Sequence, residues 1–100
     1  MSSNGLGNFI SSSRGESSPS IVAQKAKEMG LNPVYFSTRK AKKYMIQDDR
    51  QKWIHFGQKG YEDFTAHNDE KRRDKFRSRN RKWATARVYS PAWLSYYLLW

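Results

Sequence analysis

The chain has 100 residues, a formal net charge of +10 at pH 7 and no cysteine. A chain of this length supports one small domain, which buries a smaller share of its surface than a larger domain does. The lack of cysteine excludes disulfides, thiolate catalysis and cysteine-ligated zinc. We expect no cofactor. Aromatic residues make up 15% of the chain, so the expected core consists of a few large rings.

The first 33 residues predict a flexible arm followed by a short helix. Residues 1–18 are rich in Ser, Gly and Asn, and this segment has too few apolar side chains to offset its own ordering entropy, so we expect an arm that a partner orders. Its start lacks the features of a secretory signal. Ser18 as N-cap and Pro19 at the first helical position begin a helix that runs to about Met29. Residues 19–33 therefore form a helix and a linker.

From residue 34 the pattern changes to short runs of aromatic and β-branched residues, which favour strands. The three predicted strands are Val34–Phe36, Lys43–Ile46 and Lys52–Phe56. Residues 47–51 have the length of a hairpin loop, so we predict a β-hairpin with the first run as a third, edge strand. In the last strand Trp53 and His55 alternate with the core-type residues, so one face packs on a helix and the other is partly wet. We assign Trp53 to the core or to covering a face.

The segment after the sheet predicts a strongly basic helix. This helix has Thr65 or Asn68 as its N-cap, and acidic residues precede basic ones in the order that the helix macrodipole favours. Residues 71–82 include eight basic residues and one acid, a local net charge of +7. Its large apolar residues, Phe76 and Trp83, lie seven positions apart and hence on one face. The helix gains little from its own core, so its charged face is its main feature.

The last eleven residues are nearly all apolar or aromatic. Ser90 and Pro91 repeat the helix-start signal, so residues 92–100 predict a terminal helix that is apolar around most of its circumference. Such a helix must be buried, in this chain or in another. It is about half the length of the roughly 20 residues that span a bilayer.

The chain shows no catalytic motif. His67 and Asp69 are two positions apart, about 200° around a helix, so their side chains do not face each other. A capping or loop role fits both residues better than a metal site or a general base. Glycine-rich phosphate loops, nucleophile elbows and metalloprotease motifs are absent from the sequence. We therefore expect a protein that is not an enzyme and has no small-molecule substrate.

The charge pattern predicts an acidic partner but does not choose its class. Nucleic acid would be bound mainly through phosphates and without sequence specificity, because the patch has few Asn or Gln side chains for base edges. An anionic membrane surface suits the aromatic end, but the terminal segment lacks a polar face. Packing into a protein groove accounts for that segment better, with Tyr and Trp as anchors. Covering the chain's own hairpin is the most economical alternative.

Several motifs resemble those of short basic proteins encoded by nucleocytoplasmic large DNA viruses, such as chloroviruses and mimivirus relatives. They are Lys42-Lys-Tyr-Met-Ile, Ile54-His-Phe-Gly, the segment Gly60 to Arg73 and the segment Ser90 to Trp100. The resemblance covers residues 37–100. The chain departs from it where Ser90-Pro-Ala-Trp replaces a glycine-containing turn. The resemblance implies a viral origin and no catalytic residue.

We therefore predict an α+β fold, a β-hairpin or three-stranded sheet with flanking helices, with residues 34–100 as the basic domain. The expected function is a minor capsid or cement protein of a large DNA virus particle, located in the virion and in the host cytoplasm during assembly. Its expected partners are viral capsid proteins with acidic surfaces, with DNA and an anionic membrane surface as the alternatives. The second candidate function is that of a non-specific nucleic-acid-binding or packaging protein. The expected basic contacts are Lys42, Lys43, Arg72, Arg73, Lys75, Arg77, Arg79 and Arg81. The expected aromatic and apolar anchors are Trp93, Leu94, Tyr97 and Trp100.

Overall fold

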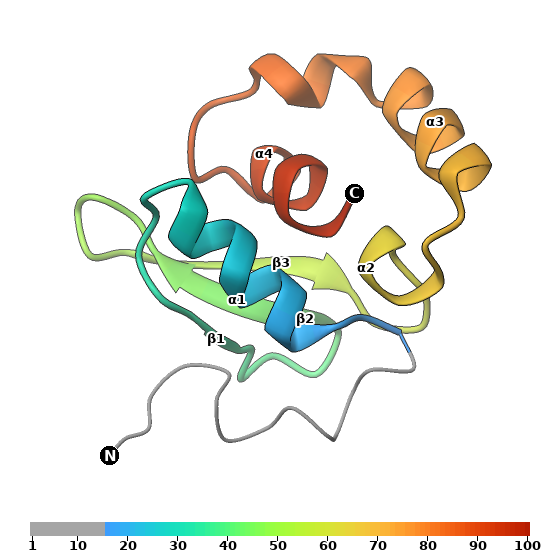
Figure 1. The fold of residues 1–100 in the computed structure, drawn as a ribbon. Helices are drawn as coiled ribbons and strands as arrows, with labels where there is room; N and C mark the ends of the chain where they lie inside the picture. The colour runs from blue at the N-terminus through green and yellow to red at the C-terminus, as the bar shows by residue number, and fades with distance from the viewer. Residues whose placement is uncertain (1–15) are drawn as a thin grey trace.

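A three-stranded antiparallel sheet with helices on one side forms the fold of this chain, a computed structural model that describes residues 16–100 (Figure 1). The elements are α1 (Pro19–Glu28), β1 (Val34–Phe36), β2 (Lys42–Gln47), β3 (Trp53–Gln58), α2 (Phe64–His67), α3 (Glu70–Arg79), the 3-10 helix η2 (Arg81–Thr85), α4 (Pro91–Leu94) and the π-helical turn η3 (Ser95–Leu99). The predicted α+β class, the three strands and the flanking helices are confirmed. Residues 1–15 of the predicted arm lie outside the described residues.

The sheet has strand order β1-β2-β3, and its register separates an inner from an outer face. Val34, Ile46 and Ile54 lie opposite one another across the three strands, as do Phe36, Tyr44 and Phe56. These residues form the inner face, and Tyr44, Ile46 and Phe56 are fully buried. The residues between them along each strand point to the other face because side chains alternate in a strand.

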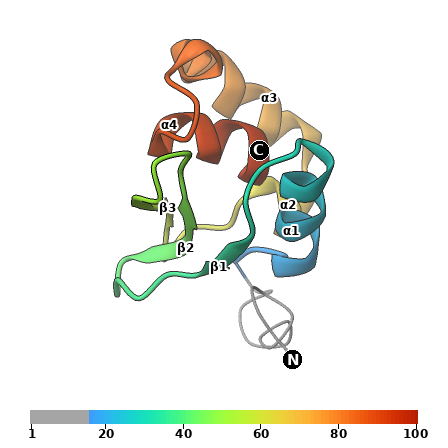
Figure 2. The same ribbon diagram turned by 90° about the vertical axis from the view of Figure 1, so that its left-hand side faces the viewer.

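The core lies between the inner sheet face and two helical segments. Figures 1 and 2 show α1 across one face of the sheet, with α4 beside it and α3 beyond α4. Val22 and Ala26 from α1 are buried against this face, together with Leu94 and Leu98 from the C-terminal helix. These four apolar side chains and the aromatic rings of Tyr44 in β2 and Phe56 in β3 therefore belong to one continuous core.

The apolar C-terminal segment folds back onto its own chain. Ser90 caps α4, since its Oγ accepts a hydrogen bond from the N–H of Trp93 at 3.3 Å. Pro91 is the first residue of the helix, as predicted. The helix continues as the π-helical turn, and Leu94, Leu98 and Leu99 are at most 2% exposed. The sequence left open whether this segment is buried in its own chain or in another. In the structure it is buried in its own chain.

Two short helices replace the single basic helix expected after the sheet. The carboxylate of Asp63 caps α2 and accepts from the N–H of Thr65 at 3.0 Å, and Asp69 caps α3 by accepting from Lys71 and Arg72. Asn68 adopts a left-handed conformation, φ 55°, that ends α2. The prediction of Thr65 or Asn68 as the N-cap was therefore wrong: an Asp carboxylate caps each helix, and Asn tolerates the left-handed turn between them.

A buried polar network joins the first described residues to the sheet. Lys43 Nζ lies 3.2 Å from Asp63 Oδ2 and donates to the main-chain oxygens of Tyr61, at 2.6 Å, and Glu16, at 3.2 Å. Asp63 in turn accepts from the hydroxyl of Thr65. These bonds satisfy an ammonium and a carboxylate that are both largely removed from water.

The network extends to Ser17, in the stretch that the sequence assigned to the arm. Ser17 is 1% exposed, its Oγ accepts from the Tyr44 hydroxyl at 2.5 Å, and it bonds to Thr65 Oγ1 at 3.2 Å. Burial raises the pKa of the Tyr44 hydroxyl, so this group acts as a neutral donor. The last residues of the predicted arm, residues 16–18, are therefore held by contacts within the chain and need no partner to order them.

Candidate functional site

A groove of about 650 Å³ opens where one end of the sheet meets α3 and the C-terminal helix. The sheet contributes the start of β2 and the end of β3, and the loop from Tyr61 to Asp63 closes one side. The residues that line it are Lys42, Lys43, Gly57, Gln58, Tyr61, Glu62, Asp63, Arg72, Lys75, Phe76, Arg79, Trp83, Pro91, Ala92, Ser95, Leu99 and Trp100. Its volume lies within the range of ligand sites in proteins.

The rim of the groove is basic because of the periodicity of α3. Arg72, Lys75 and Arg79 are spaced three and four positions apart, which places them on the same side of the helix, and Lys42 faces them from β2. Arg72 pairs with Glu62 at 3.3 Å, and both side chains are about half exposed. Within residues 16–100, Lys42, Lys75 and Arg79 have no acidic partner within 4.0 Å. Three uncompensated cations therefore surround one opening.

Aromatic rings line the floor of the groove. Trp100 stacks on Phe76 with ring centroids 4.3 Å apart and planes 7° apart, and Phe76 meets the Trp83 ring edge-on at 5.6 Å. The His67 ring also contacts Trp100, with centroids 5.2 Å apart, although His67 does not itself line the groove. All four side chains are only partly buried, so this row of rings, His67, Trp100, Phe76 and Trp83, combines internal packing with accessible aromatic surface.

His67 lies at the end of the row, where its surroundings disfavour the protonated ring. Its Nδ1 accepts from the N–H of Asp69 at 2.9 Å, and its Nε2 is buried with no hydrogen-bond partner among the described residues. Burial is the main factor that lowers the pKa of His67, and the nearby Arg72 lowers it further. The expected loop or capping role agrees with this geometry, because His67 supports the start of α3 rather than facing a substrate.

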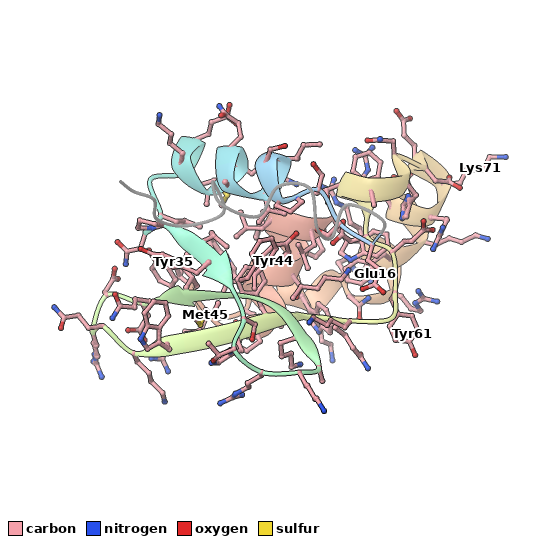
Figure 3. All side chains as sticks on the ribbon, turned by 90° about the horizontal axis from the view of Figure 1, so that it is seen from below. Glu16, Tyr35, Tyr44, Met45, Tyr61 and Lys71 are labelled. Atoms are coloured by element: carbon pink, nitrogen blue, oxygen red, sulfur yellow. The ribbon has the colours of Figure 1, made fainter. Side chains whose placement is uncertain are left out.

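Tyr61 and Gln58 also belong to the groove, although the sequence analysis did not single them out. Tyr61 is 65% exposed, and in Figure 3 its side chain points outwards at the same end of the molecule as Lys71. No spacing rule connects these loop and strand-end residues with α3, which begins nine positions after Tyr61 and twelve after Gln58. An exposed aromatic residue beside glycine was the only available signal for Tyr61.

The other predicted basic contacts offer no free charge to the groove. Lys43 lines it but is 7% exposed, and its ammonium is fully used inside the chain. Arg73 covers the Phe64 ring at 4.6 Å, and Arg77 donates to the main-chain oxygen of Trp100 at 2.9 Å. Arg81 is exposed but lies in η2, outside the groove. Lys43 was therefore wrong as a surface contact, since strand pairing and the turn at Asp63 bury it.

The predicted aromatic and apolar anchors pack mainly against this chain. Leu94 is 0% exposed, so its assignment as an anchor for a partner was wrong. The Tyr97 hydroxyl donates to the main-chain oxygen of Ala84 at 2.9 Å, and the Tyr97 ring lies 5.1 Å from Trp93. Trp100 is the one predicted anchor that lines the groove. The C-terminal helix therefore supplies the floor of a site rather than a free docking segment.

One serine–histidine pair lies outside the groove. Ser37 Oγ is 2.7 Å from His55 Nδ1 and accepts from the N–H of Arg39 at 2.9 Å. A nucleophilic serine needs a base that a third group orients. The structure gives His55 no carboxylate partner within residues 16–100, so the pair fits a turn after β1 better than a catalytic dyad. No group of three or more possible metal ligands occurs in that range.

Comparison with known proteins gives one match. Residues 33–80 are similar to a family of unknown function (DUF5754). The matched segment includes the sheet, α2, α3 and every basic residue of the rim, whereas Trp83 and Trp100 lie beyond it. No curated protein and no solved structure matches the chain. Among residues 16–100, no helix has both the length and the apolar character needed to cross a membrane.

Proposed function

We propose that this protein is a non-enzymatic binding protein that holds single-stranded nucleic acid in the groove, through phosphates and without reading sequence. The observation that carries the proposal is the combination of unpaired cations on the rim and aromatic rings on the floor of the same opening. Basic side chains attract the backbone, and accessible rings give unpaired bases a surface on which to stack.

The geometry favours a single strand over a duplex. The rings of Phe76, Trp83 and Trp100 line the same groove as the charged side chains, and a base that is splayed out of a strand can stack on them. Bases within a duplex are already stacked and present only their edges. Gln58 is the one amide side chain in the groove, so few donors and acceptors are available to tell bases apart.

A structural role in a virus particle is the second candidate, and one observation favours it. Lys71, Arg81 and Lys82 are exposed outside the groove, so the basic surface is broader than a single strand would need. Acidic faces of capsid proteins would fit that surface. The aromatic end contributes little to this role, because Leu94, Leu98 and Leu99 are buried in the chain. The viral origin inferred from the motifs is compatible with either candidate.

Salt dependence of binding to a labelled oligothymidine tests the proposal. If the three unpaired cations, Lys42, Lys75 and Arg79, each neutralise one phosphate, the log–log slope of affinity against salt is about −2, from roughly −0.7 per phosphate on single strands. Lys75→Ala should reduce this slope to about −1.4. Lys27→Ala removes an equally exposed charge on α1, outside the groove, and should change neither slope nor affinity.

Polyglutamate is the competitor that separates the two candidates. Displacement of the oligonucleotide by an equal charge concentration of polyglutamate would favour acidic protein surfaces and count against nucleic acid. Equal effects of Lys75→Ala and Lys27→Ala would show that the groove is not where the polyanion binds.

A further inference from the structure

The outer face of the sheet carries a second group of accessible aromatic and polar side chains. Tyr35, Met45 and His55 lie directly opposite one another across the three strands, and Trp53, paired with Gln47 two positions further along the register, lies on the same face. Trp53 is 42% exposed and meets the Tyr35 ring edge-on at 5.6 Å. Figures 1 and 2 show the helices gathered on the other face of the sheet, so no described helix covers these residues.

This face is flanked by basic residues. Arg39 and Lys52 are exposed, and neither has an acidic partner within 4.0 Å among the described residues. Arg39 lies close to His55, because its N–H donates to the Ser37 hydroxyl at 2.9 Å and that hydroxyl bonds to His55 Nδ1 at 2.7 Å. Burial lowers the pKa of His55, and the charges of Arg39 and Lys42 lower it further. The nearest acidic stretch is the hairpin tip, where Asp48 Oδ1 accepts from the N–H groups of Arg50 and Lys52. The surroundings of the rings are therefore net basic.

Lys42 connects this face to the groove. It lines the groove beside Gln58, its partner in the β2–β3 register, and its N–H donates to the main-chain oxygen of Arg39 at 3.2 Å. Lys42 therefore lines the same groove as Lys75 and Arg79 and is also next to Arg39, at the edge of the outer face. An anionic chain that leaves the groove at this end of the sheet meets cations and accessible rings next.

We propose that the outer sheet face continues the nucleic-acid site, so that bases of a strand leaving the groove past Lys42 stack on Trp53 and Tyr35. This inference rests on the proposed function. The pairing of cations with aromatic surface is the one that single strands require. A second copy of the chain is a poorer occupant, because Tyr35, Met45 and His55 are half-buried and a stable dimer needs roughly 800 Å² from each partner.

A length series of oligothymidines tests the inference. Affinity of the wild type should rise once, when the strand first fills the groove, and again when it is long enough to reach the outer face. Trp53→Ala should leave the affinity for short strands unchanged and weaken binding of long strands about tenfold, the size expected for one stacked base. Trp53→Phe keeps a ring and should restore most of the second rise.

Two controls make the outcomes distinguishable. Ile21→Ala removes an apolar side chain that is 41% exposed on α1, a match for Trp53, and should bind like the wild type at all lengths. Lys75→Ala should weaken short and long strands alike. If Trp53→Ala binds long strands as the wild type does while Lys75→Ala is weakened, the outer face is not part of the site but the groove stands. If neither variant differs from the wild type in binding, both the inference and the proposed function are refuted.

Sedimentation of the free protein adds a further outcome. A wild-type dimer that Trp53→Ala converts to a monomer would identify the outer face as an interface between copies and overturn the inference.

Discussion

Replacing Asp63 tests the most demanding feature of the fold, the buried ion pair between Lys43 and Asp63. The two groups are 3.2 Å apart, and their side chains are 7% and 2% exposed. Asp63→Ala leaves the Lys43 ammonium buried without a counter-ion. It also removes the N-cap of α2 and the acceptor of the Thr65 hydroxyl. One substitution therefore affects three elements: β2, α2 and the segment at residues 16–18.

The expected cost follows from these contacts. Breaking a buried pair by removing one partner costs about 3–5 kcal/mol, and losing a cap adds about 1 kcal/mol. Asp63→Ala should therefore lower the free energy of unfolding by about 4–6 kcal/mol, a large part of the roughly 5–15 kcal/mol that stabilises a small domain. Lys43→Met should cost about 3 kcal/mol, because the carboxylate keeps its two bonds from Thr65.

Urea unfolding followed by circular dichroism measures both costs, and the double variant completes a cycle. Because the double variant leaves no unpaired ion, its cost should be less than the sum of the single costs by about 1–3 kcal/mol. Asp63→Asn keeps an oxygen for the cap and should fall between wild type and Asp63→Ala. Costs that add to within about 0.5 kcal/mol, or a larger cost for Lys43→Met than for Asp63→Ala, would refute the reasoning.

Two further predictions concern Gly57 and His67. Gly57 has φ +80°, and a Cβ there would lie 3.0 Å from a side-chain methyl of Leu99, so Gly57→Ala should lower the free energy of unfolding in urea by about 2–4 kcal/mol. Gly30 has a similar φ, +73°, but open space around it, so Gly30→Ala should cost only about 1 kcal/mol. Equal costs for the two variants would exclude the contact with Leu99 as the cause. Folding lowers the pKa of His67 from its ordinary value of 6.5, so the unfolded chain takes up the proton first as the pH falls. The free energy of unfolding should therefore decrease as the pH falls through 6.5, until the histidine of the folded chain is protonated too. The urea midpoint of His67→Gln should change less between pH 7.5 and about pH 5, and a profile as steep as the wild type would contradict the assignment.

The sequence by itself determined the local structure. Ser18-Pro19 and Ser90-Pro91 mark the starts of α1 and α4. Proline is favoured at the first helical position because the N–H group that it lacks would have no hydrogen-bond partner within the helix there. Alternation in β3 separated Ile54 and Phe56 from Trp53 and His55 and so identified the inner face of that strand, and the apolar circumference of residues 92–100 required burial. These signals depend on neighbours within a few positions, so they can be read without the fold.

The tertiary structure decided what the charged and aromatic side chains do. In the sequence, residues 71–82 are one basic run, but α3 directs Lys75 and Arg79 to the groove and Arg73 and Arg77 to Phe64 and Trp100. Before this run, the left-handed Asn68 separates α2 from α3, so two helices form where the capping and charge signals predicted one. Which side of a helix becomes a site depends on what the rest of the chain packs against it.

Lys43 and Trp100 show the same limit most clearly. Each is typical of an exposed or partner-binding residue by composition, yet Lys43 is buried by Asp63, twenty positions away, and Trp100 stacks on Phe76, twenty-four positions away. Local sequence patterns carry no information about such pairings, because the distance along the chain says nothing about which surfaces meet. The sequence therefore determined the elements and the basic character of this protein, whereas packing between distant segments decided which cations and rings form the groove.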